Sequence, residues 1–186
     1  MGVILIFRSD LMPNCRFAVV LADPAWPSAS TGPCGLARSH YPLMTHAAIC
    51  SFLPLKYVAD DAALFLWVRS PGLIKALEVL PAWGFKYKTI AFTWAKITRN
   101  GGPQFGNGHY TRPASELCLL GIRGRPKVNS HSVRQLIMAE RRGHSRKPDL
   151  YDGIEQLFEG PYLELFARQR RLGWTSWGNE IGKFQV

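Results

Sequence analysis

The sequence contains no long apolar run. Its hydrophobic opening stretch, Val3 to Phe7, is far too short to span a bilayer, and no signal-peptide pattern follows it. The apolar fraction is 47% and the charged fraction 19%, which is typical of globular rather than disordered chains. We therefore expect a soluble, cytoplasmic protein with no membrane partner. At 186 residues it is expected to form one domain with a proper core.

Cysteine is scarce, and no two cysteines form a C-x-x-C pair. The four are Cys15, Cys34, Cys50 and Cys118. In a cytosolic protein such cysteines are expected to be reduced. An alternative interpretation takes Cys34, His40 and His46 as metal ligands, but their spacing matches no standard zinc module. The sequence therefore predicts no metal site.

Acidic residues are few: 13 Asp and Glu stand against 23 Lys and Arg, for a formal charge of +10. The excess is concentrated between Lys96 and Lys147, where Glu116 and Glu140 are the only acids. Aromatic rings and histidines lie among these cations, at His109, Tyr110 and His131. Cations that hold phosphates beside rings that stack on bases are typical of a nucleic-acid surface. The alternative is a solvated face that only keeps the protein soluble.

Strand-like and helix-like segments alternate along the chain. Strands are expected at 17–22, 62–68, 86–94, 115–121, 161–166 and 172–177. One helix is expected to begin at Ser70-Pro71, with one apolar face formed by Leu73, Ile74, Leu77 and Leu80. A second is expected from Pro148, with Leu150, Ile154, Leu157 and Phe158 at helical spacing. Thr45 is expected to cap a shorter helix through Phe52, and 132–140 is ambiguous between strand and helix. Such alternation predicts an α/β fold with a mostly parallel, doubly wound sheet.

Two long stretches, 27–44 and 97–113, lack clear periodicity. Loops of this length in a compact domain are usually lids or binding loops. The alternative, a disordered connector, competes most seriously for 97–108.

Polar chemistry is concentrated where the first buried strand ends, at Asp23-Pro24-Ala25-Trp26. Open α/β sheets bind their ligands at the carboxyl ends of strands. The segment offers a carboxylate and a backbone carbonyl as acceptors, and an indole for stacking. This set suits a planar ligand that carries an amino group, such as adenine or cytosine.

Several segments, in order, resemble the MT-A70 family of S-adenosylmethionine-dependent adenine-N6 methyltransferases, especially small bacterial and phage members. They are Ala22 to Trp26, His40 to Thr45, Leu64 to Val68, Trp83 to Phe85, Thr93 to Lys96, Gly108 to Tyr110, Glu116 to Gly121, His144 to Asp149, Glu164 to Arg168 and Trp177 to Glu180. The resemblance spans roughly 17–181, and this many motifs in family order are specific.

The resemblance implies a Rossmann-like class I methyltransferase fold, with helices on both faces of the sheet, in circularly permuted order. The strand before Asp23 would precede the cofactor strand at 161–166. Since S-adenosylmethionine has no phosphate, no glycine-rich phosphate loop is needed.

The resemblance also implies a set of site residues, with no metal among the cofactors. The catalytic segment would be Asp23, Pro24, Ala25 and Trp26. Residues that contact the substrate would be Tyr41, Lys96, His109, Tyr110 and Glu116. S-adenosylmethionine would be held by Asp23, Lys147, Glu164, Phe166, Arg168, Asn179 and Glu180. Two acceptors on the hydrogens of N6 would stabilise charge that develops on that nitrogen.

The sequence departs from the family pattern at three places. Ala25 replaces the usual proline, Ala167 replaces a common glycine, and Gln169-Arg170-Arg171 replaces the polar residues that often follow the arginine.

DNA is the expected substrate, with RNA as the alternative. A further alternative is a catalytically silent nucleic-acid-binding subunit. A homodimer or a partner subunit is possible in either case.

Overall fold

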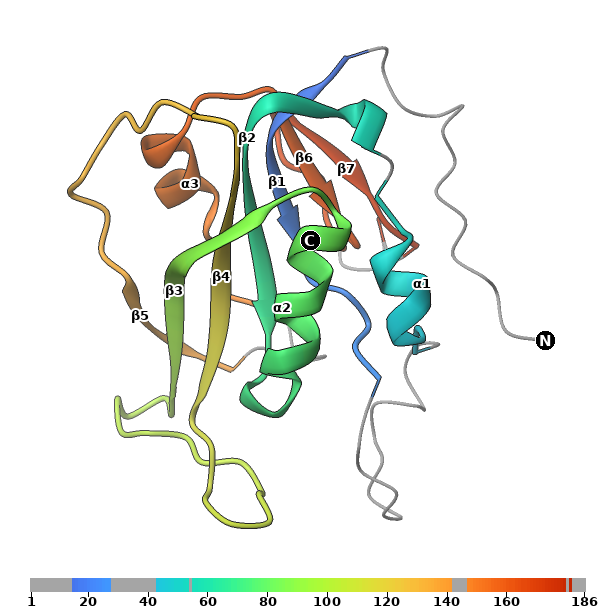
Figure 1. Cartoon of the computed structure of the whole chain (residues 1–186). Helices are drawn as coiled ribbons and strands as arrows, with labels where there is room; N and C mark the ends of the chain where they lie inside the picture. The colour runs from blue at the N-terminus through green and yellow to red at the C-terminus, as the bar shows by residue number, and fades with distance from the viewer. Residues whose placement is uncertain (1–14, 28–42, 54, 142–146, 180, 182–186) are drawn as a thin grey trace.

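The computed structural model describes residues 15–27, 43–53, 55–141, 147–179 and 181 (Figure 1). Within them the chain forms one sheet whose strands are β1 (Phe17–Ala22), β2 (Val58–Val68), β3 (Lys86–Ile97), β4 (Ser115–Arg123), β5 (Leu136–Glu140), β6 (Tyr162–Leu165) and β7 (Trp174–Trp177). The helices are α1 (His46–Cys50), α2 (Leu73–Ala82) and α3 (Tyr151–Leu157), with short 3₁₀ turns η2 (Leu55–Tyr57) and η3 (Ser70–Gly72).

The strand order is β5-β3-β4-β2-β1-β6-β7. Strand β1 pairs in parallel with β2 and β6, β6 with β7, and β3 with β5, whereas β4 is antiparallel to both of its neighbours. Among the described strands, β4 alone runs against the others. The mostly parallel α/β sheet is thus confirmed, and it is Rossmann-like. The carboxyl ends of β1, β2, β3 and β6 meet at one edge, and β4 begins there.

Helices cover both faces of this sheet (Figure 1). Because side chains alternate along a strand, the residues of β2 divide between two cores. Leu64 and Leu66 join the core that also contains Ile49 of α1 and Val79 of α2. On the other face, Phe65, Trp67 and their neighbours pack with Tyr151 and Ile154 of α3. The prediction of a doubly covered sheet is confirmed.

The predicted strands all form, although their bounds differ in places. Strand β1 has its predicted ends, whereas β2 begins four residues earlier than predicted, at Val58. The ambiguous segment 132–140 contains a strand, β5, at the edge of the sheet. The Thr45 hydroxyl caps α1 as expected, accepting a hydrogen bond from the Ala48 N–H at 3.2 Å.

The predicted apolar face of α2 is wrong in part. Ile74 is 75% exposed and Leu77 37% exposed, while Ala76, Val79 and Leu80 are buried. The Ser70-Pro71 start forms the 3₁₀ turn η3 rather than the first turn of an α-helix. A 3₁₀-helix has three residues per turn, whereas an α-helix has 3.6. The 3₁₀ turn therefore changes which face of the following helix packs against the sheet. The α3 positions Leu150, Ile154 and Phe158 are buried as predicted.

The stretch 97–113 is a loop that projects beyond the edge where β1 ends (Figure 1). Strand β3 runs on to Ile97, which forms an isolated bridge with Pro103, and the Thr98 N–H donates to the Gly102 carbonyl at 2.7 Å. Most of the other long stretch, residues 28–42, lies outside the described residues. In the described part of the chain, no helix is both long and apolar enough to cross a bilayer.

Candidate active site

Asp23 lies directly after β1, at the carboxyl edge of the sheet and near its middle. Pro24 is buried, whereas the Asp23 side chain keeps 27% exposure. The N–H of Trp26 donates to the Pro24 carbonyl oxygen at 2.8 Å, and the N–H of Met44 donates to the Ala25 carbonyl oxygen at 3.0 Å. The backbone after β1 is therefore held in one tight turn.

The indole of Trp26 is anchored from its nitrogen. Its Nε1 donates to the backbone carbonyl of Trp67, at the end of β2, at 2.8 Å. The ring also packs against the core that lies under α1 and α2. This bond fixes the orientation of a ring that stands three residues from the Asp23 carboxylate.

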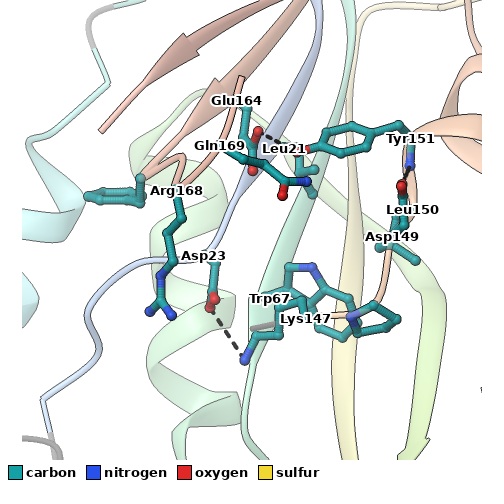
Figure 2. A pocket seen from close by; sticks show the side chains of 12 residues that line it. Leu21, Asp23, Trp67, Lys147, Asp149, Leu150, Tyr151, Glu164, Arg168 and Gln169 are labelled. Carbon is teal, nitrogen blue, oxygen red and sulfur yellow. Dashed lines mark hydrogen bonds and ion pairs between the residues drawn. The ribbon is translucent and has the colours of Figure 1, made fainter. Parts of the chain in front are cut away.

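Lys147 lies beside Asp23, with 3.6 Å between Nζ and Oδ1 (Figure 2). Its ammonium group also donates to Oε2 of Glu116 on β4 and lies 5.5 Å from the centroid of the Trp67 ring. The other oxygen of Glu116 accepts a hydrogen bond from Lys96 of β3 at 2.5 Å. Glu116 is 4% exposed, so it is a buried acid held between two lysines.

Burial and neighbouring charges shift the pKa values of these groups. Burial raises the pKa of Asp23, and Glu116 raises it further, while Lys147 and Arg168 oppose the change. Burial alone would raise the pKa of Glu116, but Lys147 and Lys96 lower it overall. The two carboxylates raise the pKa of Lys147 despite its burial. Lys147 is therefore charged at neutral pH, and Asp23 is a more basic carboxylate than usual.

A pocket opens beside Asp23, on the face of the sheet that α3 covers (Figure 2). Its lining comes from the ends of β1, β2 and β6, from the segment before α3 and from the segment after β6. The residues are Leu21, Asp23, Trp67, Lys147, Pro148, Asp149, Leu150, Tyr151, Glu164, Phe166, Arg168 and Gln169. The structure thus brings four of the predicted cofactor residues together with Asp23.

Glu164 faces this pocket from β6. The Tyr151 hydroxyl donates to its Oε2 at 2.7 Å, and Gln169 lines the same pocket. Burial raises the pKa of Glu164 to about 7, with the charges of Asp23 and Asp149 adding to that effect and the Tyr151 hydrogen bond opposing it. The carboxyl is thus half-protonated near neutral pH.

Phe166 follows β6 in a left-handed backbone conformation, with φ of 62°. A bulky residue with positive φ is strained, and such strain is often found at ligand sites. This conformation interrupts the alternation of side chains along the strand. The centroid of the Phe166 ring lies 4.6 Å from that of Phe52 and 6.2 Å from that of Trp177. Phe166 thus joins the aromatic cluster near α1 and still lines the pocket.

The remaining predicted site residues lie apart from this pocket or outside the described residues. His109 and Tyr110 are exposed on the β3–β4 loop, and Asn179 is exposed in the turn after β7. Tyr41 and Glu180 lie outside the described residues, as do Cys34 and His40 of the alternative metal site. In the described part of the chain, no three His, Cys, Asp or Glu residues are grouped so as to hold a metal ion.

Seven of the twelve lining residues were not predicted as site residues, among them Trp67, Tyr151 and Gln169. Trp67 belongs to the Leu64 to Val68 motif. Its strand is apolar throughout, so the sequence did not indicate that this ring faces a ligand. Gln169 was noted only as a departure from the family pattern. Tyr151 lies within the helix predicted from Pro148, and its hydrogen bond with Glu164 depends on tertiary structure.

The family model named MT-A70 matches residues 17–180. A type II methyltransferase, M.MunI, from a Mycoplasma species is 31% identical over 192 residues, which cover 91% of this chain and 80% of that protein. An Arabidopsis thaliana protein, the N(6)-adenosine-methyltransferase MT-A70-like, is 34% identical over 94% of this chain. The human N(6)-adenosine-methyltransferase catalytic subunit METTL3 is 32% identical over 89% of this chain. The matches cover only 25% of the Arabidopsis protein and 28% of the human one.

Proposed function

Because this chain belongs to the MT-A70 family and is an adenine-N6 methyltransferase, we propose that S-adenosylmethionine is its methyl donor and that adenine in DNA is its preferred acceptor. The observation that carries the proposal is the place of Asp23 and Pro24. They stand where β1 ends, beside a pocket whose charged lining suits that donor.

The acceptor amine would bind at Asp23 and Pro24. The exocyclic N6 of adenine is a weak nucleophile, because its lone pair is delocalised into the ring. Hydrogen bonds from its two N–H groups to the Asp23 carboxylate and the Pro24 carbonyl would stabilise positive charge that develops during attack. The Pro24 oxygen already accepts from the Trp26 N–H, and a carbonyl has a second lone pair for the amine. The raised pKa of Asp23 makes its carboxylate a stronger acceptor.

The pocket residues fit the chemistry of S-adenosylmethionine, which supplies the methyl group as a sulfonium when bound. Its carboxylate would be held by the cationic side chains of Lys147 and Arg168. The ribose hydroxyls are donors that suit the Glu164 carboxylate, at the end of a parallel strand. Phe166 offers an apolar surface, and all four residues line the same pocket. Asn179 and Glu180 remain proposed contacts further along the chain.

The preference for DNA is proposed from the likeness to a type II methyltransferase and from the charge of the β3–β4 loop. The chain covers 80% of a compact type II methyltransferase but about a quarter of its longer plant and human relatives. The β3–β4 loop carries Arg99 and Arg112 and no acid, and it projects past the edge where Asp23 lies (Figure 1). Cations there would contact a phosphate backbone on either side of an extruded base.

The proposal is tested with labelled S-adenosylmethionine and four matched oligonucleotides, single- and double-stranded, of DNA and of RNA. Mass spectrometry of the digested nucleosides reports which base, position and sugar carry the label. N6-methyldeoxyadenosine is the expected product. If N6-methyladenosine were the only methylated product, the substrate would be RNA rather than DNA. Cofactor and oligonucleotide binding without any methylated product would instead favour the silent subunit.

A further inference from the structure

Four charged groups of alternating sign lie in a row at this site: Asp23, Lys147, Glu116 and Lys96. The Lys147 ammonium lies 3.6 Å from Oδ1 of Asp23 and donates a hydrogen bond to Glu116. Glu116 in turn accepts from Lys96 at 2.5 Å. The four come from the ends of β1, β3 and β4 and from the segment before α3.

Lys147 forms ion pairs with both acids, and its contact with Glu116 is much the shorter of the two. A separation of 3.6 Å is longer than a charge-assisted hydrogen bond, whereas the contact with Glu116 is a direct one. Glu116 has both of its oxygens engaged, and its exposure is 4%. Because both oxygens already accept hydrogen bonds from lysines and the side chain is buried, the geometry favours a role in holding Lys147 over the substrate contact that the sequence suggested.

We propose that Glu116 is a positioning residue: it holds the Lys147 ammonium off Asp23, and Lys96 keeps Glu116 charged for that purpose, so that both oxygens of Asp23 stay available to the acceptor amine. The inference deepens the proposed function and rests on it.

Two physical effects support this assignment. A buried ammonium needs a carboxylate partner, so without Glu116 the nearest one for Lys147 would be Asp23. Lys147 would then hydrogen-bond to the oxygens that N6 needs. Lys96 matters because a buried acid with a single cation would bind a proton more readily, and protonated Glu116 would release Lys147. The Lys96 ammonium is itself 5.0 Å from the Trp94 ring centroid, which helps to fix it.

The test compares Glu116→Gln and Lys96→Met with matched controls on the same sheet, Glu140→Gln on β5 and Lys88→Met on β3, both exposed. The first readout is the pKa of the Asp23 carboxyl, followed by ¹³C NMR in the protein without ligands and identified by its loss in Asp23→Asn. The groups that act on Asp23 are Lys147, Glu116 and Arg168, and Asp23 also interacts electrostatically with Glu164 and with the buried Cys118 thiol. In Glu116→Gln this pKa is expected to fall, because an anion is lost and Lys147 moves closer.

The second readout is methyl transfer as a function of pH. Glu116→Gln is expected to lower kcat at least tenfold, with KM for the oligonucleotide changed less than threefold and the acid limb of the profile moved to lower pH. Lys96→Met is expected to keep kcat at high pH and to lose it as pH falls through the raised pKa of Glu116, at higher pH than in the unmodified chain, because protonated Glu116 releases Lys147. The controls are expected to match the unmodified chain.

If Glu116 only stabilised the fold by linking the strands, the results would differ. It would lower the melting temperature and kcat together in Glu116→Gln, leave the Asp23 pKa unchanged, and shift neither acid limb. That result overturns the inference. If no variant and not even the unmodified chain transfers methyl groups, the proposed function fails, while the NMR titration still decides how Lys147 is positioned.

Discussion

The N–H of Trp26 donates a hydrogen bond to the carbonyl oxygen of Pro24, at 2.8 Å. A bond between residues two apart defines a γ-turn, whose central residue here is Ala25. Among the described residues other than glycine, Phe166 alone has a positive φ, so Ala25 has the negative φ of an inverse γ-turn. That turn has φ of about −75°, which lies within the range that proline imposes.

Ala25→Pro is therefore expected to be tolerated, although proline is absent at this position. The turn uses the N–H of Trp26 and the carbonyls of Pro24 and Ala25, all of which the variant retains. A proline already in its preferred conformation restricts the unfolded chain, and the free energy of unfolding should rise by about 0.4–1 kcal/mol. Chemical denaturation measures this change, and methyl transfer should stay within about threefold. Ala25→Gly is the matched control and should destabilise; a destabilised Ala25→Pro would contradict the inverse γ-turn.

Asp23→Ala is expected to abolish methyl transfer and leave the fold intact. The fold survives because Lys147 keeps Glu116 as a partner, so no buried cation is left uncompensated. Asp23→Asn, which keeps the shape and loses the charge, should reduce transfer by about 10²–10³-fold. The measurements are single-turnover transfer and thermal melting of the same preparations. Undiminished transfer in Asp23→Ala would remove Asp23 from the mechanism.

The stability of the protein should depend on pH through Glu164. Its pKa in the folded state is about 7, against 4.5 for the free group, so the folded state binds the proton more tightly. The corresponding stability is fully present below about pH 4.5 and is lost as pH rises through 7. Glu164→Gln should thus be more stable than the unmodified chain by about 1–3 kcal/mol at pH 8, with the difference vanishing toward pH 4.5. Urea unfolding across this range measures it, and a constant difference would contradict the shifted pKa.

How much of the site the sequence predicts depends on whether the signal is local. Asp23, Pro24 and Trp26 form one continuous motif at the end of a strand, and the structure has that strand with its predicted ends. The sheet was predictable for the same reason, because alternating strands and helices are read from short windows. The buried face of α2 was mispredicted, since a 3₁₀ turn of three residues cannot be distinguished from a helix start by its Ser-Pro signal.

Contacts between segments that are far apart in the chain could not be predicted from the sequence. Glu116 and Lys96 were both suggested as substrate contacts, and no periodicity reveals that one pairs with the other or that both stand behind Lys147. Tyr151 donates a hydrogen bond to Glu164 because α3 packs on the face of the sheet from which the Glu164 side chain of β6 extends. Such pairs depend on strand order and on helix placement, which local patterns do not specify.

Tyr151→Phe should weaken cofactor binding and alter its pH dependence. The variant keeps the ring, which lies 5.0 Å from that of Trp174, and loses the hydroxyl that donates to Glu164. Loss of that bond raises the pKa of Glu164 further, so less of the carboxylate is ionised at pH 7. Affinity for S-adenosylmethionine should fall roughly fivefold to tenfold at pH 7, the value of one such hydrogen bond, and recover at higher pH.

Calorimetric titrations between pH 6 and 9 measure that effect. Tyr162→Phe is the matched control, because its hydroxyl donates at 2.9 Å to the Phe158 carbonyl rather than to a pocket residue. Equal affinities for Tyr151→Phe and the unmodified chain at every pH would show that Glu164 does not meet the cofactor.

The exposed rings and cations of the β3–β4 loop should contribute separately to nucleic-acid binding. Tyr110 is fully exposed, and the Arg112 guanidinium lies 5.6 Å from the ring centroid of Phe105. A ring without neighbours contributes nothing to the fold, so Tyr110→Ala should leave the melting temperature unchanged. It should weaken oligonucleotide binding by about 1–3 kcal/mol if a base stacks on it. Tyr87→Ala is the control, since that exposed ring lies near the start of β3, at the opposite edge of the sheet.

Salt then separates stacking from charge. Stacking is insensitive to ionic strength, so Tyr110→Ala should keep the slope of log K against log salt. Arg99→Gln removes one exposed cation and should reduce that slope by about 0.7 for a single strand or 0.9 for a duplex. Binding measured by fluorescence anisotropy from low to moderate salt gives both values. An affinity that stays flat as salt rises would exclude this loop as a phosphate-binding surface, because contact between cations and a polyanion must release counterions.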